Sequence, residues 1–384
     1  MPLGIYISVP FCRTKCSYCN FASGVFAKSM FSGYVDRIVD EIVAAESQVT
    51  RVGRGCVDSI YLGGGTPTLL PEAELRRVFA ALRDSFSISR DAEITVECAP
   101  GTITYSVLET LVGCGVNRVS LGVQSFVDQE AASVARLHSR ETVLDDIRRL
   151  RIAGIENINV DLIAGLPRQT KESWEFSLIE VLATGVPHVS VYMLEVDEDS
   201  RLGRELIAGG TRYHAHSVPD EDATADFYVW ACEKLNAAGV EQYEISNFAR
   251  QGFESRHNLK YWTRQPYLGF GVDAHSMLDG VRFANPESFE DYLAGKAGTE
   301  TKVSREAARE EAFFLGLRLN KGVNLCEVVK EFGMDEELNN TVAELCADGL
   351  LEQGTEFIRL TERGRLVSNE VFQRFIAEPA SKKR

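Results

Sequence analysis

The stretch Val9-Pro-Phe-Cys-Arg-Thr-Lys-Cys-Ser-Tyr-Cys-Asn-Phe21 decides how the rest of this 384-residue chain is organised. Its three cysteines, Cys12, Cys16 and Cys19, have the spacing C-x3-C-x2-C and directly follow a short apolar run. Thiolates are the usual protein ligands of a 4Fe–4S cluster, which contains four irons. Three thiolates this close together can hold three irons and leave the fourth open to an outside ligand.

Two other uses of these cysteines stay open on their spacing alone. A zinc site needs a fourth Cys or His within reach, and the next cysteine along the chain is Cys56. A disulfide framework fits poorly, because three is an odd number and the remaining cysteines are scattered singly. Short cysteine motifs also arise by chance, so the rest of the chain has to decide between these roles.

The composition is that of an ordinary globular chain, with 45% hydrophobic and 25% charged residues. No run of about 18 apolar residues occurs, so the sequence predicts no membrane span. The amino terminus lacks the basic region of a signal peptide, and cysteines without paired spacing fit a reducing compartment. We therefore expect a cytoplasmic protein. A formal net charge of −15 argues against binding nucleic acid, which requires a basic surface.

Short β-type runs alternate with helical patterns over residues 1–240. The expected strands are Gly4–Val9, Val57–Leu62, Glu93–Cys98, Arg118–Val123, Asn157–Ile163 and His188–Leu194. Apolar residues three and four apart predict a helix after each strand, from Phe31–Val49 after the first to Glu221–Ala238 after the sixth. Repeated β/α units predict a parallel sheet with right-handed crossovers. Because a closed barrel needs eight units, we predict an open partial (β/α)6 TIM-type barrel in the α/β class.

Polar and glycine residues gather where these strands end. Strand two runs into Gly63-Gly-Gly-Thr-Pro-Thr68, strand three ends at Glu97, strand four ends at Gln124, and strand five carries Asp161. The carboxyl ends of barrel strands form the active-site face. Each residue also has a plain structural explanation, which is a tight turn for the glycines and surface ion pairs for the acids. Their shared location with the cysteine loop favours one common site.

Several motifs recur together in one known family. They are Tyr6–Phe21, Gly63–Thr68, Glu97–Gly101, Ser120–Phe126, Ala135–His138 and Asp161–Thr170, followed by Tyr243–Phe248 and His257–Trp262. Over nearly its whole length the chain resembles the coproporphyrinogen dehydrogenase-like family of radical S-adenosylmethionine (SAM) proteins. It is more similar to the heme-chaperone branch than to the dehydrogenases. Dehydrogenases place a further cysteine where this chain has Phe21, and His-Asn-x-x-Tyr-Trp is a heme-chaperone feature.

The resemblance implies a 4Fe–4S cluster on Cys12, Cys16 and Cys19, with SAM chelating the open iron. It implies SAM contacts from Tyr6, Tyr18, Gly64, Gly65, Thr66, Glu97, Gln124, Arg136 and Asp161. It also implies a chaperone that binds heme as cargo, passes it to heme-accepting proteins and takes electrons from a donor. A homodimer and a peripheral membrane association through a partner stay open. The alternative is an oxygen-independent coproporphyrinogen III dehydrogenase, so whether the chain is an enzyme is open as well.

Carrying heme requires an axial donor, commonly a neutral imidazole, and a flat apolar surface. Among the histidines, His257 is followed by Tyr261 and Trp262, and His275 lies in a glycine-rich turn beside Phe270. We therefore expect heme near His257 or His275, at the open side of the barrel. The alternative is that His257 caps a loop and the aromatic residues belong to the core.

Three positions depart from the family pattern. Ala135 stands where glycine is usual, Cys98-Ala99 where Ala-Asn is common, and Val272-Asp273 where Pro-Gly is typical. The first two departures are conservative in size. Asp273 adds a charge beside the expected heme region.

The pattern changes after residue 300. Helices are expected at Arg305–Leu319, Leu325–Phe332 and Glu337–Asp348, followed by a hairpin around Gly354 and a closing helix at Thr361–Ile376. This order predicts a small winged-helix-like α+β module. Its acidic second helix favours packing or a protein partner over DNA binding. We therefore expect three parts, namely a radical SAM core at 1–240, a linking region at 241–300, and the C-terminal module at 301–384.

Overall fold

The computed structural model describes residues 2–51, 56–333 and 335–376. Within them, a twelve-stranded sheet has the order β12-β11-β10-β9-β1-β2-β3-β4-β5-β6-β8-β7. Its middle six strands pair in parallel and in chain order. They are β1 (Leu3–Val9), β2 (Cys56–Gly64), β3 (Ser87–Cys98), β4 (Arg118–Gln124), β5 (Asn157–Ala164) and β6 (His188–Met193). The predicted open partial barrel is confirmed.

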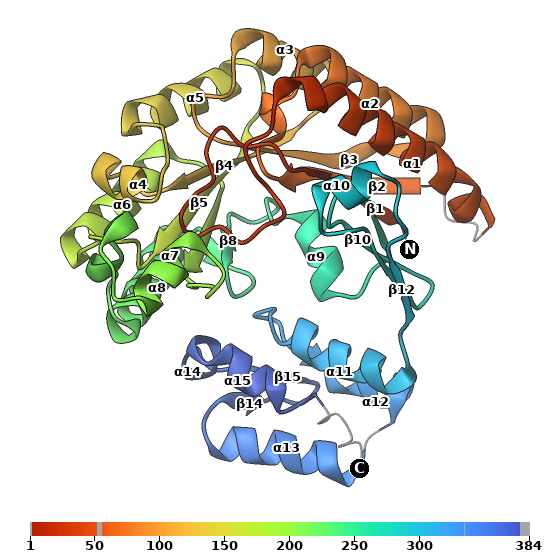
Figure 1. Ribbon diagram of the computed structural model, residues 1–384. Helices are drawn as coiled ribbons and strands as arrows, with labels where there is room; N and C mark the ends of the chain where they lie inside the picture. The colour runs from red at the N-terminus through yellow and green to blue at the C-terminus, as the bar shows by residue number, and fades with distance from the viewer. Residues whose placement is uncertain (1, 52–55, 334, 377–384) are drawn as a thin grey trace.

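Helices cover the outside of this barrel in an arc (Figure 1). They are α1 (Phe31–Arg51), α2 (Glu72–Ser85), α3 (Tyr105–Gly113), α4 (Asp128–Ser133), α5 (Arg140–Ile152), α6 (Lys171–Thr184), α7 (Arg201–Ile207) and α8 (Glu221–Ala237), with the short 3-10 helices η1 (Lys28–Met30), η2 (Pro67–Leu69) and η3 (Arg212–Ser217). Each long helix turns an apolar face inward, as Leu75, Val78 and Phe79 of α2 illustrate. The helices cover the outer face of the sheet, and its inner face lines the barrel interior. Because both faces are covered, the strand sequences are nearly continuous apolar runs.

Residues 241–300 add strands to both edges of the sheet, which the sequence did not predict. On one edge lie β7 (Glu241–Gln242) and β8 (Asn247–Ala249), and on the other lie β9 (Tyr267–Phe270), β10 (His275–Leu278), β11 (Val281–Ala284) and β12 (Thr299–Lys302). Strand β9 pairs in parallel with β1, whereas β8 pairs antiparallel with β6. The same region contains α9 (Arg256–Trp262) and α10 (Phe289–Leu293). Strands of two to four residues are too short to carry a readable alternation.

The C-terminal module has its own small core around Phe313, whose ring stacks on Phe375 at 4.7 Å. It contains α11 (Arg305–Gly316), β13 (Val323–Asn324), α12 (Leu325–Phe332), α13 (Glu336–Ala347), β14 (Leu351–Gln353), β15 (Phe357–Leu360), α14 (Glu362–Leu366) and α15 (Ser368–Gln373). The expected order of helices and hairpin is confirmed. The single closing helix at Thr361–Ile376 is wrong, because the backbone leaves helical geometry at Val367. This break lets Val371 and Phe372 reach the module's core.

The module lies across the open side of the barrel (Figure 1). Hydrogen bonds fasten it, one from Ile245 N–H to the Arg318 carbonyl at 3.1 Å and one from the side-chain Nδ2 of Asn320 to the Gln242 carbonyl at 2.6 Å. The Arg318 guanidinium also lies 3.6 Å from Glu244 and over the Trp262 ring. The open side of the barrel is therefore partly walled by a second unit. No helix within the described ranges is both long and apolar enough to cross a membrane.

Candidate functional site

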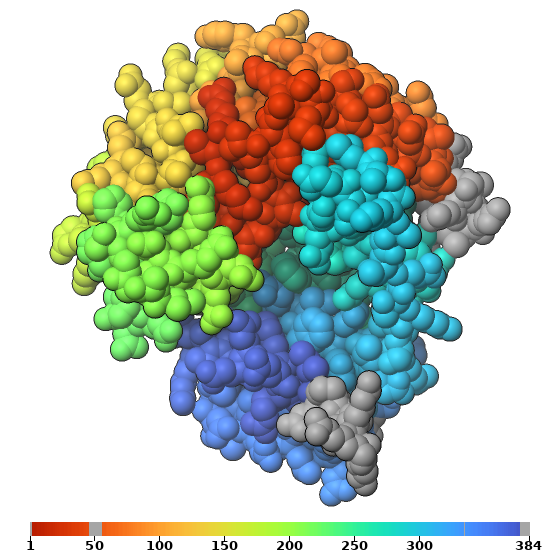
Figure 2. Space-filling model, viewed as in Figure 1, coloured from red at the N-terminus to blue at the C-terminus, as the bar shows by residue number. Residues whose placement is uncertain are grey.

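A cavity of about 1250 Å³ opens at the carboxyl ends of the barrel strands. Its wall contains the three motif cysteines together with eight of the nine SAM candidates, namely Tyr18, Gly64, Gly65, Thr66, Glu97, Gln124, Arg136 and Asp161. Figure 2 shows a recess on this face between the red N-terminal segment, the green segment and the blue C-terminal module. The structure thus brings together residues that lie up to 149 positions apart (161 − 12) in the sequence.

The cysteine loop is fixed by backbone hydrogen bonds to its neighbours. The Gly65 amide donates to the Val9 carbonyl at 2.8 Å, and the Thr66 amide donates to the Phe11 carbonyl at 2.8 Å. A Cβ atom on Gly65 would lie only 2.7 Å from Val9 O, so this close approach requires glycine. On its other side, the Ser17 amide donates to the Val134 carbonyl at 3.4 Å. The glycine motif therefore positions the loop that carries the cysteines.

Cys12, Cys16 and Cys19 are free and partly exposed to the cavity. In the part of the chain that the structure describes, no three His, Cys, Asp or Glu side chains converge on a point where one ion could bind. A 4Fe–4S cluster does not require such a point, because each thiolate binds a different iron of the cube. Cys56 is exposed at the start of β2, at the opposite end of the barrel strands. The donor set therefore fits a cluster better than a single zinc ion.

Glu97, near the end of β3, is half-buried and lines the cavity. Tyr61 Oη donates to its Oε1 at 2.8 Å, and the Gly64 amide donates to its Oε2 at 3.1 Å. Burial, followed by the charge of Asp161, raises the pKa of Glu97 to about 7. The carboxylate is thus oriented by two donors and changes charge close to neutral pH.

Asp161 heads a ladder of polar side chains inside the barrel. Its Oδ2 accepts from Ser120 Oγ at 3.0 Å, and its Oδ1 accepts from Asn159 Nδ2 at 2.7 Å. Asn159 Oδ1 in turn lies 2.6 Å from His188 Nδ1. Burial raises the pKa of Asp161, while hydrogen bonds from Ser190, Ser120 and Asn159 oppose that rise. No sequence pattern predicted this ladder, because Asn159 and Ser190 read as ordinary strand residues.

Arg136 lies deep in the cavity wall, where its Nη2 donates to Tyr18 Oη at 3.3 Å. Its Nε is buried and has no hydrogen-bond partner among the described residues. Nearby, Gln124 ends β4 with φ +70° where the pairing of β4 with β5 shifts register. A non-glycine residue with positive φ is uncommon and often marks a functional position. The site therefore offers a buried donor to an anionic group and an amide held in a strained conformation.

Two departures from the family pattern have a common conformational meaning. Ala135 has φ +65° and Asp273 has φ +56°, which is the left-handed region that favours glycine. Both residues stand where the family pattern expected from the sequence has glycine. The chain therefore keeps the backbone shape of the turn while losing the residue that adopts it without strain.

Tyr6 is the one SAM candidate outside the cavity wall. It lies in the middle of β1, and its ring stacks on Tyr61 with 6.1 Å between centroids. A Cβ atom on Gly64 would lie 3.4 Å from Tyr6 Oη, so the hydroxyl reaches the back of the glycine motif. A SAM contact from Tyr6 stays a prediction.

The structure separates the two histidines expected near heme. His257 is 1% exposed and lies against Ser59, at the amino end of β2, with its Nδ1 3.0 Å from Ser59 Oγ and its Nε2 2.8 Å from Tyr261 Oη. It is therefore at the end of the barrel opposite the cysteine loop, rather than at the open side. His275 is exposed at the start of β10, with its Nε2 3.9 Å from Asp273. A heme-binding role for either residue stays a prediction.

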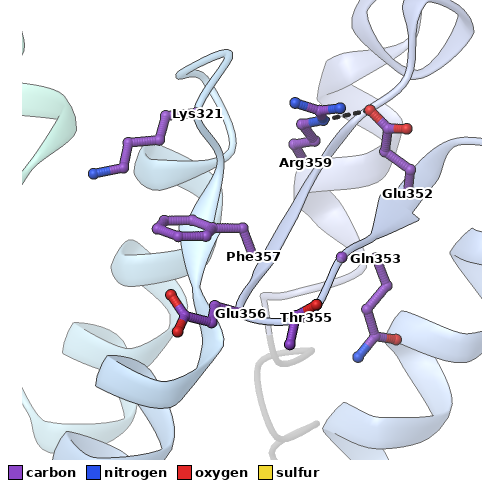
Figure 3. Close-up of a pocket in the computed structure, with 8 residues that line it drawn as sticks. Lys321, Glu352, Gln353, Thr355, Glu356, Phe357 and Arg359 are labelled. Atoms are coloured by element: carbon purple, nitrogen blue, oxygen red, sulfur yellow. Dashed lines mark hydrogen bonds and ion pairs between the residues drawn. The ribbon is translucent and has the colours of Figure 1, made fainter.

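The C-terminal module supplies cavity residues that sequence reasoning missed. Arg318, Ser368 and Glu370 line the cavity opposite the cysteine loop. Their participation depends on how two units pack together, and no local pattern announces it. A second hollow, of about 530 Å³, lies on the module's hairpin beside Phe357 and the Arg359–Glu352 pair (Figure 3). Neither cysteine nor histidine lines that hollow.

Comparison with known proteins assigns the chain to a family. The model of the Radical SAM superfamily matches residues 6–180, and that of the HemN C-terminal domain matches residues 303–367. The heme chaperone HemW of Lactococcus lactis is 33% identical, with 98% of each chain covered. HemW of Bacillus subtilis is 34% identical, with 97% of this chain and 99% of the relative covered. The chain belongs to the HemW family of radical SAM proteins.

Similarity extends at lower identity to a solved structure described as a radical SAM enzyme. The structure described as coproporphyrinogen III oxidase (HemN) from Escherichia coli is 26% identical to this chain, with a TM-score of 0.84. The alignment covers 97% of this chain and 90% of the other. HemW of Escherichia coli is 29% identical over 98% of this chain. This chain and that HemN structure therefore share both the barrel and the C-terminal module, so the global fold alone does not distinguish a heme chaperone from a coproporphyrinogen III oxidase.

Proposed function

We propose that this chain is a heme chaperone that binds heme and delivers it to acceptor proteins, using a 4Fe–4S cluster on Cys12, Cys16 and Cys19 together with SAM. One observation carries the proposal. A single cavity in a HemW-family chain is lined by the three cysteines and by eight residues with SAM-binding chemistry. The names of the relatives, which are heme chaperones, indicate that the cargo is heme.

Each side chain has a role that follows from its contacts. Gly65 lets the backbone of the cysteine loop pack closely against the glycine motif, and Gly64 directs its amide to the Glu97 carboxylate. The carboxylates of Glu97 and Asp161 suit the hydroxyl groups of a ribose, and the Arg136 guanidinium suits the SAM carboxylate. When bound, SAM completes the coordination of the open iron and supplies radical chemistry upon reduction. The neighbouring donors on Glu97 and Asp161 fix the direction in which each carboxylate accepts.

The proposal extends to the organisation and partners of the chain. Residues 1–240 form the radical SAM core, 241–300 link it to the module, and 301–384 form the C-terminal module. The partners are heme, heme-accepting proteins and an electron donor, in the cytoplasm. A homodimer and a peripheral membrane association through a partner belong to the same proposal. Nucleic acid does not, because the net charge of −15 repels phosphate.

The test is an anaerobic reconstitution followed by heme transfer. The full chain with iron and sulfide should gain the visible absorption of a 4Fe–4S cluster, bind SAM and bind heme, then lose the heme to an apo-hemoprotein. A chain that binds cluster and SAM but no heme would contradict the chaperone function. A chain that binds zinc instead of a cluster would contradict the whole proposal.

The rival function is oxygen-independent coproporphyrinogen III dehydrogenation, which the likeness to HemN favours. Reconstituted, reduced protein with SAM and coproporphyrinogen III should form no vinyl groups, because Phe21 replaces the further cysteine of the dehydrogenases. Escherichia coli HemN in the same assay is the positive control. Vinyl formation by this chain would replace the chaperone assignment with the dehydrogenase.

A further inference from the structure

The histidines differ in how many ring nitrogens the fold already uses. His188 and His257 are buried, and hydrogen bonds within the chain use both nitrogens of each ring. The large cavity at the carboxyl ends of the strands is not lined by His214, His216 or His275. His138 alone among the six lines that cavity. It is therefore the histidine best placed to meet a ligand there.

The hydrogen bond that His138 makes determines its tautomer. Its Nε2 lies 3.0 Å from the Val123 carbonyl, and a carbonyl oxygen only accepts, so Nε2 carries the proton. Burial, followed by the charge of Arg136, lowers the pKa of His138 to about 4, so the ring is neutral at pH 7. Its Nδ1 then holds a lone pair, and no described residue hydrogen-bonds to it. Metal-binding histidines are commonly fixed in this way, with one nitrogen donating to a backbone carbonyl.

The surroundings of His138 combine apolar and cationic groups. Leu137, next to it, is 70% exposed, and Phe21 of the cysteine loop is 64% exposed, yet both line the cavity. The two segments touch, because Thr14 Oγ1 donates to the Ala135 carbonyl at 2.9 Å. Arg13 and Lys15 also line the cavity, and Lys15 Nζ donates to the Phe21 carbonyl at 3.1 Å. Phe21 and Leu137 offer exposed apolar surface to a ligand in the cavity, and the two cations suit a ligand that carries carboxylates.

The cavity has room for more than one ligand. Sites for a single small molecule commonly measure ~300–1,000 Å³, whereas this cavity measures about 1250 Å³. Phe21 and Leu137 are mostly exposed parts of its lining, whereas Gln124 is buried and Glu97 is half-buried. The outer part therefore suits a flat apolar molecule.

We propose that His138 Nδ1 is the axial ligand of the cargo heme, whose ring lies against Phe21 and Leu137 with its propionates toward Arg13 and Lys15. This inference rests on the proposed heme-binding function and gives that function a site at the mouth of the cysteine cavity. The heme iron gains a bond to neutral imidazole without any transfer of protons or electrons.

Titration of the full chain with ferric heme tests the assignment, with the Soret band and electron paramagnetic resonance as readouts. The His138→Gln variant keeps an N–H that can donate to the Val123 carbonyl but lacks the ligating nitrogen. It should bind heme at least tenfold more weakly and lose the imidazole-bound spectrum, and added free imidazole should restore that spectrum. A merely structural histidine would not be rescued in this way. The matched variants His257→Ala and His275→Ala should keep the wild-type spectrum.

Loss of the proposed contacts from Arg13 and Lys15 to the heme propionates should give a different result from loss of the iron ligand. The double variant Arg13→Ala/Lys15→Ala should weaken heme binding while the Soret maximum stays where it is, since the iron ligand is unchanged. An unaltered spectrum in His138→Gln, or an altered one in His257→Ala or His275→Ala, overturns the site and leaves the chaperone function intact. A wild-type chain that binds no heme overturns the function itself.

Discussion

The two ends of the barrel use buried polar side chains in opposite ways. At the amino end, Glu93 accepts from the backbone amides of Arg256 and His257, at 3.1 and 3.0 Å, and Lys260 pairs with Asp58 at 2.7 Å. At the carboxyl end, the three motif thiols are free and line the cavity, and Arg136 lines the same cavity. Buried polar groups are normally satisfied. A side chain that the fold has satisfied holds the fold together, whereas one that keeps bonding capacity toward a cavity is available to a ligand.

The cysteines give the sharpest test of this contrast. Replacing Cys12, Cys16 or Cys19 by Ala should abolish the cluster absorption after anaerobic reconstitution, because a cube with two unprotected irons does not persist. Cys56→Ala is the matched control from the other end of the barrel strands and should keep the full absorption. Loss of the cluster in Cys56→Ala would mean that a fourth protein ligand exists, and the open-iron interpretation would then fail.

Glu97 should make SAM binding depend on pH. Its pKa of about 7 means that the carboxylate is mostly charged at pH 8 and mostly protonated at pH 6. Hydroxyl groups donate better to the charged carboxylate, so SAM affinity should rise between pH 6 and pH 8. The rise should be at most about tenfold, because the charged fraction of a single carboxylate with this pKa rises by about that factor over the interval. Glu97→Gln should bind SAM about tenfold more weakly at pH 8 and show no such rise.

Calorimetric titration of SAM into the reconstituted protein measures both effects. Glu93→Gln is the control, because Glu93 lies on the same strand but faces α9 at the amino end. It should keep the wild-type affinity and pH profile. Equal SAM affinity for wild type and Glu97→Gln at both pH values would remove Glu97 from the site.

The sequence predicted the carboxyl end well because its signals are local. Each of the six strands is followed by a helical pattern, and the cysteines, Gly64, Glu97 and Asp161 follow from where those strands stop. Parallel topology then forces these residues onto one face. The amino end could not be derived in the same way. His257 reads as a candidate ligand until its contacts with Ser59 and Tyr261 are known, and those depend on α9 packing back against β2.

Substitutions at the amino end should change the stability of the fold rather than the binding of ligands. Glu93→Ala leaves two buried amides of α9 without acceptors, which should lower the free energy of unfolding by about 2–4 kcal/mol. Denaturant unfolding of the apo chain measures this, and the cluster absorption of reconstituted protein below the transition should be unchanged.

Glu97→Gln should behave differently from Glu93→Ala in the free energy of unfolding. Its raised pKa means that the folded state loses stability as pH rises from about 4.3 to 7, so removing the charge should not lower stability at pH 8.

The smallest expected effect concerns the strained turn beside the cavity. Ala135 has φ +65°, which costs a residue with a Cβ about 1–2 kcal/mol relative to glycine. Glycine in turn loses about 0.5–1 kcal/mol more backbone entropy on folding. Ala135→Gly should therefore raise the free energy of unfolding by up to about 1 kcal/mol. Asp273→Gly should gain less, because Asp tolerates this backbone region better than Ala.

Ala132 offers the matched control, because it is exposed in α4 only three residues earlier and has ordinary helical geometry. Ala132→Gly should lower the free energy of unfolding by about 0.5–1 kcal/mol. Opposite signs for these two Ala→Gly changes, measured in the same denaturant experiment, would locate stored strain at the turn that carries Arg136 and His138. Equal losses in both variants would mean that the turn is relaxed, and its alanine would then be a neutral departure from the family pattern.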